Sequence, residues 1–361
     1  MSGRLPFQIL KTAGILVVFY VYFLTKVRGQ TANYLPADQV AADFKKLLER
    51  PRTSPRPGLR TIKTDSVTIE RGFFYSEKTE KVPLLIYKPI EAETKKLPVI
   101  ICLHGTGGGK DNQDIKNMLF YFSKLGFIAV AIDARFHGER AQPTVNEMSS
   151  YENAILEAWK NKDPKCQSHP FFYDTVFDLW RLTDYLISRT DVDASRIGMT
   201  GISMGGIETW MAASVDHRIK VAVPIIAAQS FKWSLENSQW QGRAGTIWRV
   251  HKAVAKDRGD SEVSKENVRM LWNKIIPEIL DEFDCPSMIR LFAPRPLLLL
   301  NNEKDQNCPL PGAEIAFATA AKAYSNANAS DKLKVNVSPN EPHRFLEEHL
   351  KLASDWFIKW L

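Results

Sequence analysis

Residues 196–206 read Arg-Ile-Gly-Met-Thr-Gly-Ile-Ser-Met-Gly-Gly. An apolar strand passes here through the pattern Gly-x-Ser-x-Gly and continues into a helical pattern, which is typical of a nucleophile elbow. In such an elbow a strained turn lifts the serine hydroxyl beyond the edge of a sheet. Gly201 and Gly205 suit the turn, because a Cβ at either position would fill space that the backbone needs. The segment therefore predicts Ser203 as a nucleophile.

A second glycine-rich segment follows another apolar strand. After Pro98–Leu103 the chain reads His-Gly-Thr-Gly-Gly-Gly over 104–109, and these small residues expose backbone N–H groups. An N–H of Thr106 or Gly107, together with that of Met204 at the start of the next helix, is expected to bind the negative oxygen of a tetrahedral intermediate. A phosphate cradle is not expected, because an aspartate follows the lysine of this segment where a P-loop requires Ser or Thr.

The partners of such a serine are expected later in the chain, an acid and then a histidine, each just after a strand. Asp305 follows a run of four leucines, and His343 follows a short strand-like segment just before the terminal helical pattern. His343 would take the serine proton and return it to the leaving group, while Asp305 orients the imidazole. Glu303 is the main rival for the acid, and Asp281 and Asp284, which precede the strand, are further rivals.

The charged loop IDARFHGER follows a buried strand and is expected to support the glycine-rich loop through Asp133, Arg135 or His137. His104, His137 and His169 lack the i, i+4 or His-x-Glu spacing of a zinc site, so no metal is expected.

Apolar runs alternate with amphipathic stretches from Val67 onward, which predicts an α/β fold with a mainly parallel, eight-stranded sheet covered by helices on both faces. The expected strands are 67–75, 82–87, 98–103, 127–132, 196–200, 221–227, 296–300 and 334–337. The interval 229–293 is too long for a simple crossover and is expected to form a helical cap, with one helical pattern over 266–283. Trp233 and Trp240, close after a strand end, are candidates for a substrate pocket.

The motifs GISMGG, HGTGG, IDARFHGER, APRPLLLLNNEKD and PHRF together resemble the α/β-hydrolase superfamily. Within it the similarity is to the dienelactone hydrolases, acetyl xylan esterases and catalytic domains of prolyl oligopeptidases. The resemblance covers residues 66–361 and implies an α/β-hydrolase domain. Two features depart from the pattern: Thr106 stands where an oxyanion glycine is expected, and the cap matches no part with a known substrate.

This resemblance, with the predicted triad, implies a serine hydrolase that cleaves small-molecule carboxylic esters through a covalent acyl-enzyme and needs no cofactor. One alternative is a serine peptidase of small peptides, of the acyl-peptide or dipeptidyl type. The residues before 66 cannot build the β-propeller of those peptidases, so the ester is the expected substrate. A non-catalytic binding protein of the same fold is a further alternative, but such proteins usually break the triad.

Composition limits the remaining classes. The 361 residues are 44% hydrophobic and 25% charged, as in an ordinary globular protein. Lys and Arg number 48 against 41 Asp and Glu, without a basic block, so no nucleic-acid partner is expected. The four cysteines show no CxxC or metal-finger spacing.

The amino terminus carries an apolar run, Ala13–Leu24, between basic residues. Residues 1–30 are expected to be a single-pass membrane anchor of the endoplasmic reticulum or secretory pathway, because Lys26 and Arg28 suit a lipid headgroup boundary better than a signal-peptidase site. A cleaved signal segment, giving a secreted protein, is the alternative. Residues 31–65, rich in proline and basic side chains, are expected to be a linker.

Overall fold

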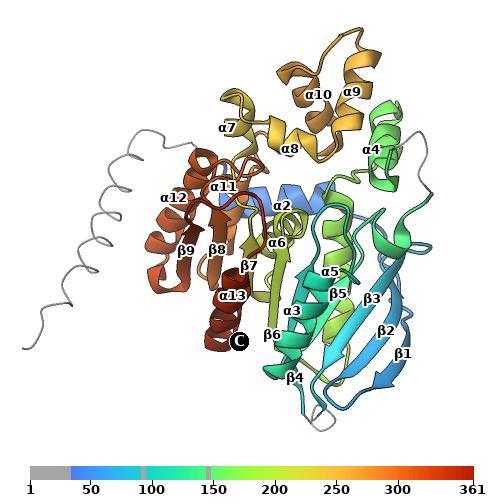
Figure 1. The fold of residues 1–361 in the computed structure, drawn as a ribbon, viewed down its shortest axis with the longest axis vertical. Coiled ribbons are helices and arrows are strands. Elements are labelled where there is room, and N and C mark those ends of the chain that lie inside the picture. The colour runs from blue at the N-terminus through green and yellow to red at the C-terminus, as the bar shows by residue number, and fades with distance from the viewer. Residues whose placement is uncertain (1–33, 91–94, 144–147) are drawn as a thin grey trace, which may run out of the picture. The chain divides into compact units, whose positions relative to one another are not determined.

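A computed structural model of the protein describes residues 34–90, 95–143 and 148–361. The unit Pro36–Leu361 contains one nine-stranded sheet with the order β1-β2-β3-β5-β4-β6-β7-β8-β9 (Figure 1). Its strands are β1 (Gly58–Lys63), β2 (Thr68–Tyr75), β3 (Lys81–Lys88), β4 (Leu97–Leu103), β5 (Ile128–Ile132), β6 (Val192–Ile202), β7 (Ile219–Ile225), β8 (Leu297–Asn302) and β9 (Leu333–Ser338). Strands β4 to β9 pair in parallel, whereas β1, β2 and β3 form an antiparallel edge.

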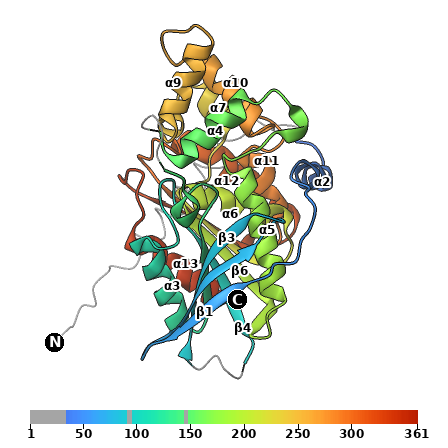
Figure 2. The ribbon, with the colours of Figure 1, turned by 90° about the vertical axis from the view of Figure 1, so that its right-hand side faces the viewer.

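Helices cover both faces of this sheet, as predicted (Figure 2). Helices α3 and α13 pack on one face around a shared apolar cluster, and α5 and α6 pack on the other. The main helices are α2 (Ala37–Leu47), α3 (Gln113–Lys124), α4 (Ser150–Lys160), α5 (Tyr173–Ile187), α6 (Met204–Val215), α7 (Phe231–Glu236), α8 (Gln241–Gly245), α9 (Trp248–Asp257), α10 (Lys265–Ile275), α11 (Cys285–Ile289), α12 (Leu310–Asn326) and α13 (Glu347–Trp360).

The central strands are buried on both faces. All five residues of β5 and all six of β8 are buried, and β4 is buried after its first residue. Such strands need near-continuous apolar sequence, because neither face meets water. This requirement is why the runs VIICL, IAVAI and LLLL predicted strands correctly.

The expected eight strands all occur, but the sheet has a ninth, so the predicted strand number is corrected. Strand β1 lies in the segment 31–65 that was expected to be a linker, and α2 lies there too. Four of the six β1 residues are exposed, because this strand sits at the sheet edge and pairs only with β2. An exposed edge strand needs no apolar alternation, so its sequence carries little signal.

The interval 229–293 holds the short helices α7 to α11, and α7 to α10 lie beyond the carboxyl ends of the parallel strands (Figure 1). The helix expected over 266–283 is shorter: α10 ends at Ile275, because Pro277 disfavours helical backbone at the residue before it. Helix α4, from the loop after β5, packs against α9 and α10. The cap therefore includes a segment that the sequence analysis did not assign to it.

The prediction of a membrane-spanning helix is corrected. Within residues 34–90, 95–143 and 148–361, no helix is both long and apolar enough to cross a membrane. The apolar run on which the prediction rested, and the whole of residues 1–30, lie outside the described residues.

Candidate active site

Ser203 occupies a strained turn between β6 and α6. Its backbone lies at φ 54° and ψ −109°, and its N–H donates to the carbonyl of Ile225 at 2.9 Å. A Cβ at Gly201 would lie 2.4 Å from backbone atoms of Gly205, and a Cβ at Gly205 would lie 2.5 Å from the carbonyl oxygen of Leu103. Both glycines are therefore required by close backbone contacts, as the elbow pattern predicted.

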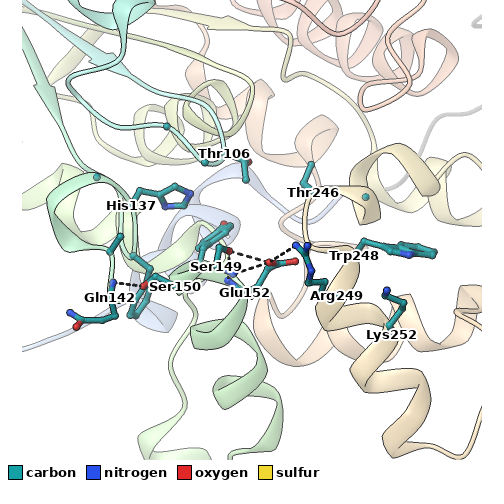
Figure 3. A pocket seen from close by; sticks show the side chains of 17 residues that line it. Thr106, His137, Gln142, Ser149, Ser150, Glu152, Thr246, Trp248, Arg249 and Lys252 are labelled. Atoms are coloured by element: carbon teal, nitrogen blue, oxygen red, sulfur yellow. Dashed lines mark hydrogen bonds and ion pairs between the residues drawn. The ribbon is translucent and has the colours of Figure 1, made fainter. Parts of the chain in front are cut away.

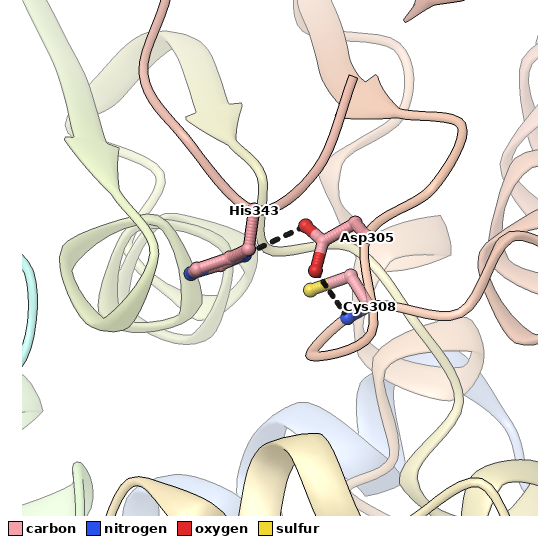
Figure 4. A group of neighbouring side chains, drawn as sticks. All are labelled: Asp305, Cys308 and His343. Atoms are coloured by element: carbon pink, nitrogen blue, oxygen red, sulfur yellow. Dashed lines mark hydrogen bonds and ion pairs between the residues drawn. The ribbon is translucent and has the colours of Figure 1, made fainter. Parts of the chain in front are cut away.

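The structure brings the three predicted triad residues together. His343 Nε2 lies 2.8 Å from Ser203 Oγ, and His343 Nδ1 lies 2.7 Å from Asp305 Oδ2. The other carboxylate oxygen of Asp305 accepts a hydrogen bond from the backbone N–H of Asn307 at 2.7 Å. It accepts a second one from the backbone N–H of Cys308 at 2.9 Å (Figure 4). Ser203 and Asp305 are buried. The two backbone N–H groups hold the Asp305 carboxylate in place, and this carboxylate orients the imidazole of His343.

Within the described part of the chain, none of the rival acids forms a hydrogen bond or ion pair with His343. Glu303 accepts a hydrogen bond from the backbone N–H of Asn340 at 2.7 Å. Asp281 pairs with Lys232 at the surface. Asp284 is buried beneath α7, where burial raises the pKa of its carboxyl to about 7 despite several hydrogen bonds that it accepts.

Asp305, Cys308 and His343 place one potential metal-binding atom each within 4.8 Å of one another (Figure 4). Burial raises the pKa of the Cys308 thiol well above its usual range, so this group stays protonated and is a poor zinc ligand. Both imidazole nitrogens of His343 are already hydrogen-bonded. The cluster is explained by the hydrogen-bonded triad.

The glycine-rich loop after β4 begins beside the serine. A Cβ at Gly105 would lie 3.7 Å from the Cβ of Ser203 and 3.5 Å from the carbonyl oxygen of Ile202. His104 holds this loop: its Nε2 accepts from the N–H of Ala134 at 3.0 Å, so its Nδ1 donates to the Gly105 carbonyl at 2.8 Å. Burial lowers the pKa of His104, which keeps this neutral form.

Asp133 supports the far end of the same loop. One carboxylate oxygen accepts from the backbone N–H of Lys110 at 2.7 Å, and the other lies 2.9 Å from the Lys110 ammonium. Gly138, at φ 53°, leaves room for this carboxylate, since a Cβ there would lie 2.3 Å from it. Arg135, another expected support, pairs with Asp178 instead. Asp133 thus makes the contact that the charged loop was expected to provide.

A cavity of about 550 Å³ opens next to the glycine-rich loop (Figure 3). Thr106 and Gly107 line it on one side, and residues of α4, α9 and the segment 136–142 line the others. Trp233 and Trp240, the predicted pocket residues, do not line this cavity: Trp233 packs against α12, and Trp240 is buried. The tryptophan at the cavity is Trp248.

Sequence reasoning missed the part of this cavity formed by α4. A signal for that helix was present, because Ser149 and Glu152 have the spacing of a capping box, and both capping hydrogen bonds form. The contact of α4 with α9 joins segments about a hundred residues apart, and no local pattern encodes it.

Comparisons with known proteins agree with this architecture. Residues 27–232 match the family model of acetyl xylan esterase (AXE1). The protein YtaP of Bacillus subtilis (strain 168) is 26% identical over 267 residues, which are 71% of this chain and 76% of that protein. The solved acetyl xylan esterase from Paenibacillus sp. R4 has a TM-score of 0.67 at 20% identity, covering 94% of this chain and 99% of that chain. Acetyl xylan esterase 1 from Thermoanaerobacterium sp. JW/SL YS485 has a TM-score of 0.63 at 19% identity, covering 93% and 98%.

The sheet, its covering helices and these structural matches define an α/β-hydrolase, which confirms the predicted fold class. The family model matches more than half of the residues of this chain, so the chain belongs to the acetyl xylan esterase family. It is a carboxylester hydrolase. This membership separates it from the peptidases and non-catalytic binding proteins that the sequence left open.

Proposed function

We propose that the protein hydrolyses carboxylic esters through an acyl-enzyme formed on Ser203, with His343 as general base and acid and Asp305 as its orienting partner. The observation that carries this proposal is the unbroken hydrogen-bonded chain from Asp305 through His343 to Ser203, with contacts of 2.7 and 2.8 Å. This arrangement has the geometry by which a base activates a serine hydroxyl.

The directions of the hydrogen bonds set the proton path. Nδ1–H of His343 donates to Asp305, which leaves Nε2 to accept the hydroxyl proton of Ser203. Ser203 Oγ attacks the ester carbonyl carbon as its proton passes to Nε2, and the alcohol leaves with that proton as the tetrahedral intermediate collapses. Water then attacks the acyl-enzyme by the same route and releases the acid. Asp305 accepts the Nδ1–H hydrogen bond of His343 and stabilises the imidazolium that forms.

The negative oxygen of each tetrahedral intermediate would be held by the backbone N–H of Met204 and that of Thr106 or Gly107. Met204 begins α6, whose N-terminus carries a partial positive charge. The loop with Thr106 starts at Gly105, which is beside Ser203. A backbone donor is available whatever the side chain, so threonine at the expected glycine position is compatible with this role.

The expected substrates are short-chain esters of small molecules, acetyl esters first. Support comes from the similar solved proteins that are named as acetyl xylan esterases. The proposed reaction needs only the side chains and backbone groups named above, together with water.

Covalent labelling tests the nucleophile. A fluorophosphonate probe should modify the wild-type protein once, and mass spectrometry of the digested product should place the label on Ser203. Ser203→Ala should lose both labelling and release of 4-nitrophenol from 4-nitrophenyl acetate. Ser330→Ala, at an exposed position of the 3-10 segment Ser330–Lys332, is the matched control and should keep both. Labelling that persists in Ser203→Ala would overturn the proposal.

A further inference from the structure

The cavity of about 550 Å³ is the place where a substrate could extend from the scissile bond. It starts at Thr106, the residue after Gly105, which itself lies against Ser203. Its opposite wall is formed by the cap, from Gly245 and Thr246 to the first turns of α9 (Figure 3). If an ester is bound at Ser203, the part of the substrate that extends past Thr106 would therefore enter this cavity and contact residues of the cap.

The charged side chains of the cavity are unequally balanced. Arg249 and Lys252 contribute two cations from α9, and Glu152 contributes one carboxylate from α4. That carboxylate accepts hydrogen bonds from the backbone N–H and the hydroxyl of Ser149, and it forms an ion pair with Arg249 Nη1 at 3.6 Å, which leaves one cation in excess. Lys252 forms no ion pair or hydrogen bond with any residue that the structure describes. The cavity thus keeps an excess of positive charge.

The surrounding cap sequence strengthens this excess. Residues 237–256 contain no aspartate or glutamate, so no acid of this segment offsets the charges of Arg249 and Lys252. Helix α9 starts at the cavity without a side-chain cap and without an acid in its first turn, although acids are the residues that stabilise that position. The partial positive charge at the N-terminus of α9 and the two cations therefore all favour the binding of a negatively charged ligand.

One buried polar atom beside the cavity also lacks a partner. His137 lines the cavity, and its Nδ1 lies 2.8 Å from the carbonyl oxygen of Arg135, to which it donates. Burial lowers the pKa of His137 to about 4, so the ring is neutral at pH 7 and its Nε2 is an acceptor. This Nε2 is buried and forms no hydrogen bond within the described part of the chain. A neutral acceptor here suits a hydroxyl group of a ligand.

We propose that this cavity binds the part of the ester that is remote from the scissile bond, and that Arg249 and Lys252 select substrates in which this part carries a carboxylate or another anionic group. The inference rests on the proposed ester hydrolysis at Ser203 and adds the charge class of the substrate. It assigns to the cap residues 245–252 a role in specificity that is separate from the chemistry at the sheet edge.

Two matched pairs of probes test the charge preference. On the acyl side, 4-nitrophenyl hydrogen glutarate is compared with its terminal amide; on the alcohol side, 4-acetoxybenzoate is compared with 4-acetoxybenzamide. The readout is the ratio of kcat/KM for the carboxylate to that for the amide. In the wild type this ratio should exceed one for at least one pair, and added salt should lower it. The double variant Arg249→Gln/Lys252→Gln should lower the ratio about tenfold, which corresponds to about 1.4 kcal/mol.

Lys256→Gln provides the matched control, because it removes a cation from the same helix at a position that does not line the cavity. It should leave the ratio as in the wild type. A wild-type ratio of one or less for both pairs, or a ratio that the double variant retains, would overturn the inference while Ser203-dependent turnover of the amides leaves the proposed function standing. Turnover that survives Ser203→Ala would overturn the proposed function, and the inference with it.

Discussion

The triad at the carboxyl edge of the sheet and the cap differ in how their buried polar groups are satisfied. At the sheet edge, both carboxylate oxygens of Asp305 and both ring nitrogens of His343 have hydrogen-bond partners. In the cap, both ring nitrogens of His251 and two guanidinium nitrogens of Arg243 are buried without a partner among the described residues. The triad is therefore preorganised, whereas the cap holds polar groups that its own fold leaves unpaired.

This difference teaches that the two regions serve different ends. Catalysis requires groups that are already oriented before the substrate arrives, because reorientation during the reaction raises the barrier. Recognition of a substrate can use groups that are paired only when the substrate is bound. Changes at the sheet edge should thus affect turnover most, and changes in the cap should affect specificity or stability.

Removal of the nucleophile at the sheet edge should have the largest effect on turnover. Ser203→Ala is expected to lower kcat by a factor on the order of 10⁶, because the acyl-enzyme can no longer form. The fold should persist, since the variant leaves Gly201 and Gly205, which the backbone of the elbow requires, unchanged. Turnover of 4-nitrophenyl acetate and the circular dichroism of the purified variant provide the measurement. A well-folded variant with near wild-type kcat would show that the reaction does not use Ser203.

The acid of the triad should have the next largest effect. Asp305→Asn is expected to reduce kcat by about 10⁴, because an amide favours the wrong imidazole tautomer at His343. Glu303→Gln is the matched control: it lies two residues away, bonds the backbone of Asn340 and should change kcat by only a few-fold. Steady-state kinetics of both variants measure the two changes in kcat. The reverse order of effects would reassign the acid to Glu303.

The sequence predicted the sheet edge well for a physical reason. Strands buried on both faces need continuous apolar sequence. A Cβ at Gly201 or Gly205 would lie less than 3 Å from neighbouring atoms, so the motif as well as the composition predicts the fold there. The order of serine, acid and histidine then narrowed the site to a few residues. The choice of Asp305 over Glu303 depended on which carboxylate faces His343, and only the structure shows that orientation.

The cap was predicted less well because its contacts are tertiary. The cavity forms where α4 meets α9, so neither segment alone identifies a wall of it. The two tryptophans nearest to a strand end in sequence, Trp233 and Trp240, do not line the cavity, whereas Trp248 does. Proximity along the chain is a poor guide in a region of short helices, each of which can turn either face inward.

The support of the glycine-rich loop offers a smaller effect, measured as stability. Asp133→Asn is expected to cost about 2–3 kcal/mol, because the Asp133 carboxylate accepts from the backbone N–H groups of Lys110 and Glu139 and pairs with the Lys110 ammonium. The cost is limited because Glu139 and Asp111 still pair with that ammonium in the variant. Asp281→Asn in the cap is the control, since its ion pair with Lys232 is exposed and should contribute less than about 1 kcal/mol. Urea unfolding at pH 7 measures both. Equal losses in the free energy of unfolding of the two variants would contradict the view that Asp133 holds the glycine-rich loop in place.

The pH dependence of stability provides the smallest of these effects and probes the cap directly. Burial lowers the pKa of His251 to about 3, against about 6.5 in an unfolded chain. Between these values the unfolded chain binds a proton at this residue and the folded chain does not, so acidification favours unfolding. The stability contribution is complete above pH 6.5 and falls as the pH decreases towards 3. A single such histidine should cost about 2 kcal/mol between pH 7 and pH 5.

His251→Leu removes this titration while it keeps an apolar side chain in the same space. The free energy of unfolding should then fall less between pH 7 and pH 5 than in the wild type, by about 2 kcal/mol. Some acid sensitivity should remain, because burial also lowers the pKa of His137 and His349, each to about 4. Urea titrations of both proteins at the two pH values make the comparison. An unchanged pH dependence would mean that His251 binds a proton in the folded state and has a partner in the cap, and the contrast with the sheet edge would then disappear at this residue.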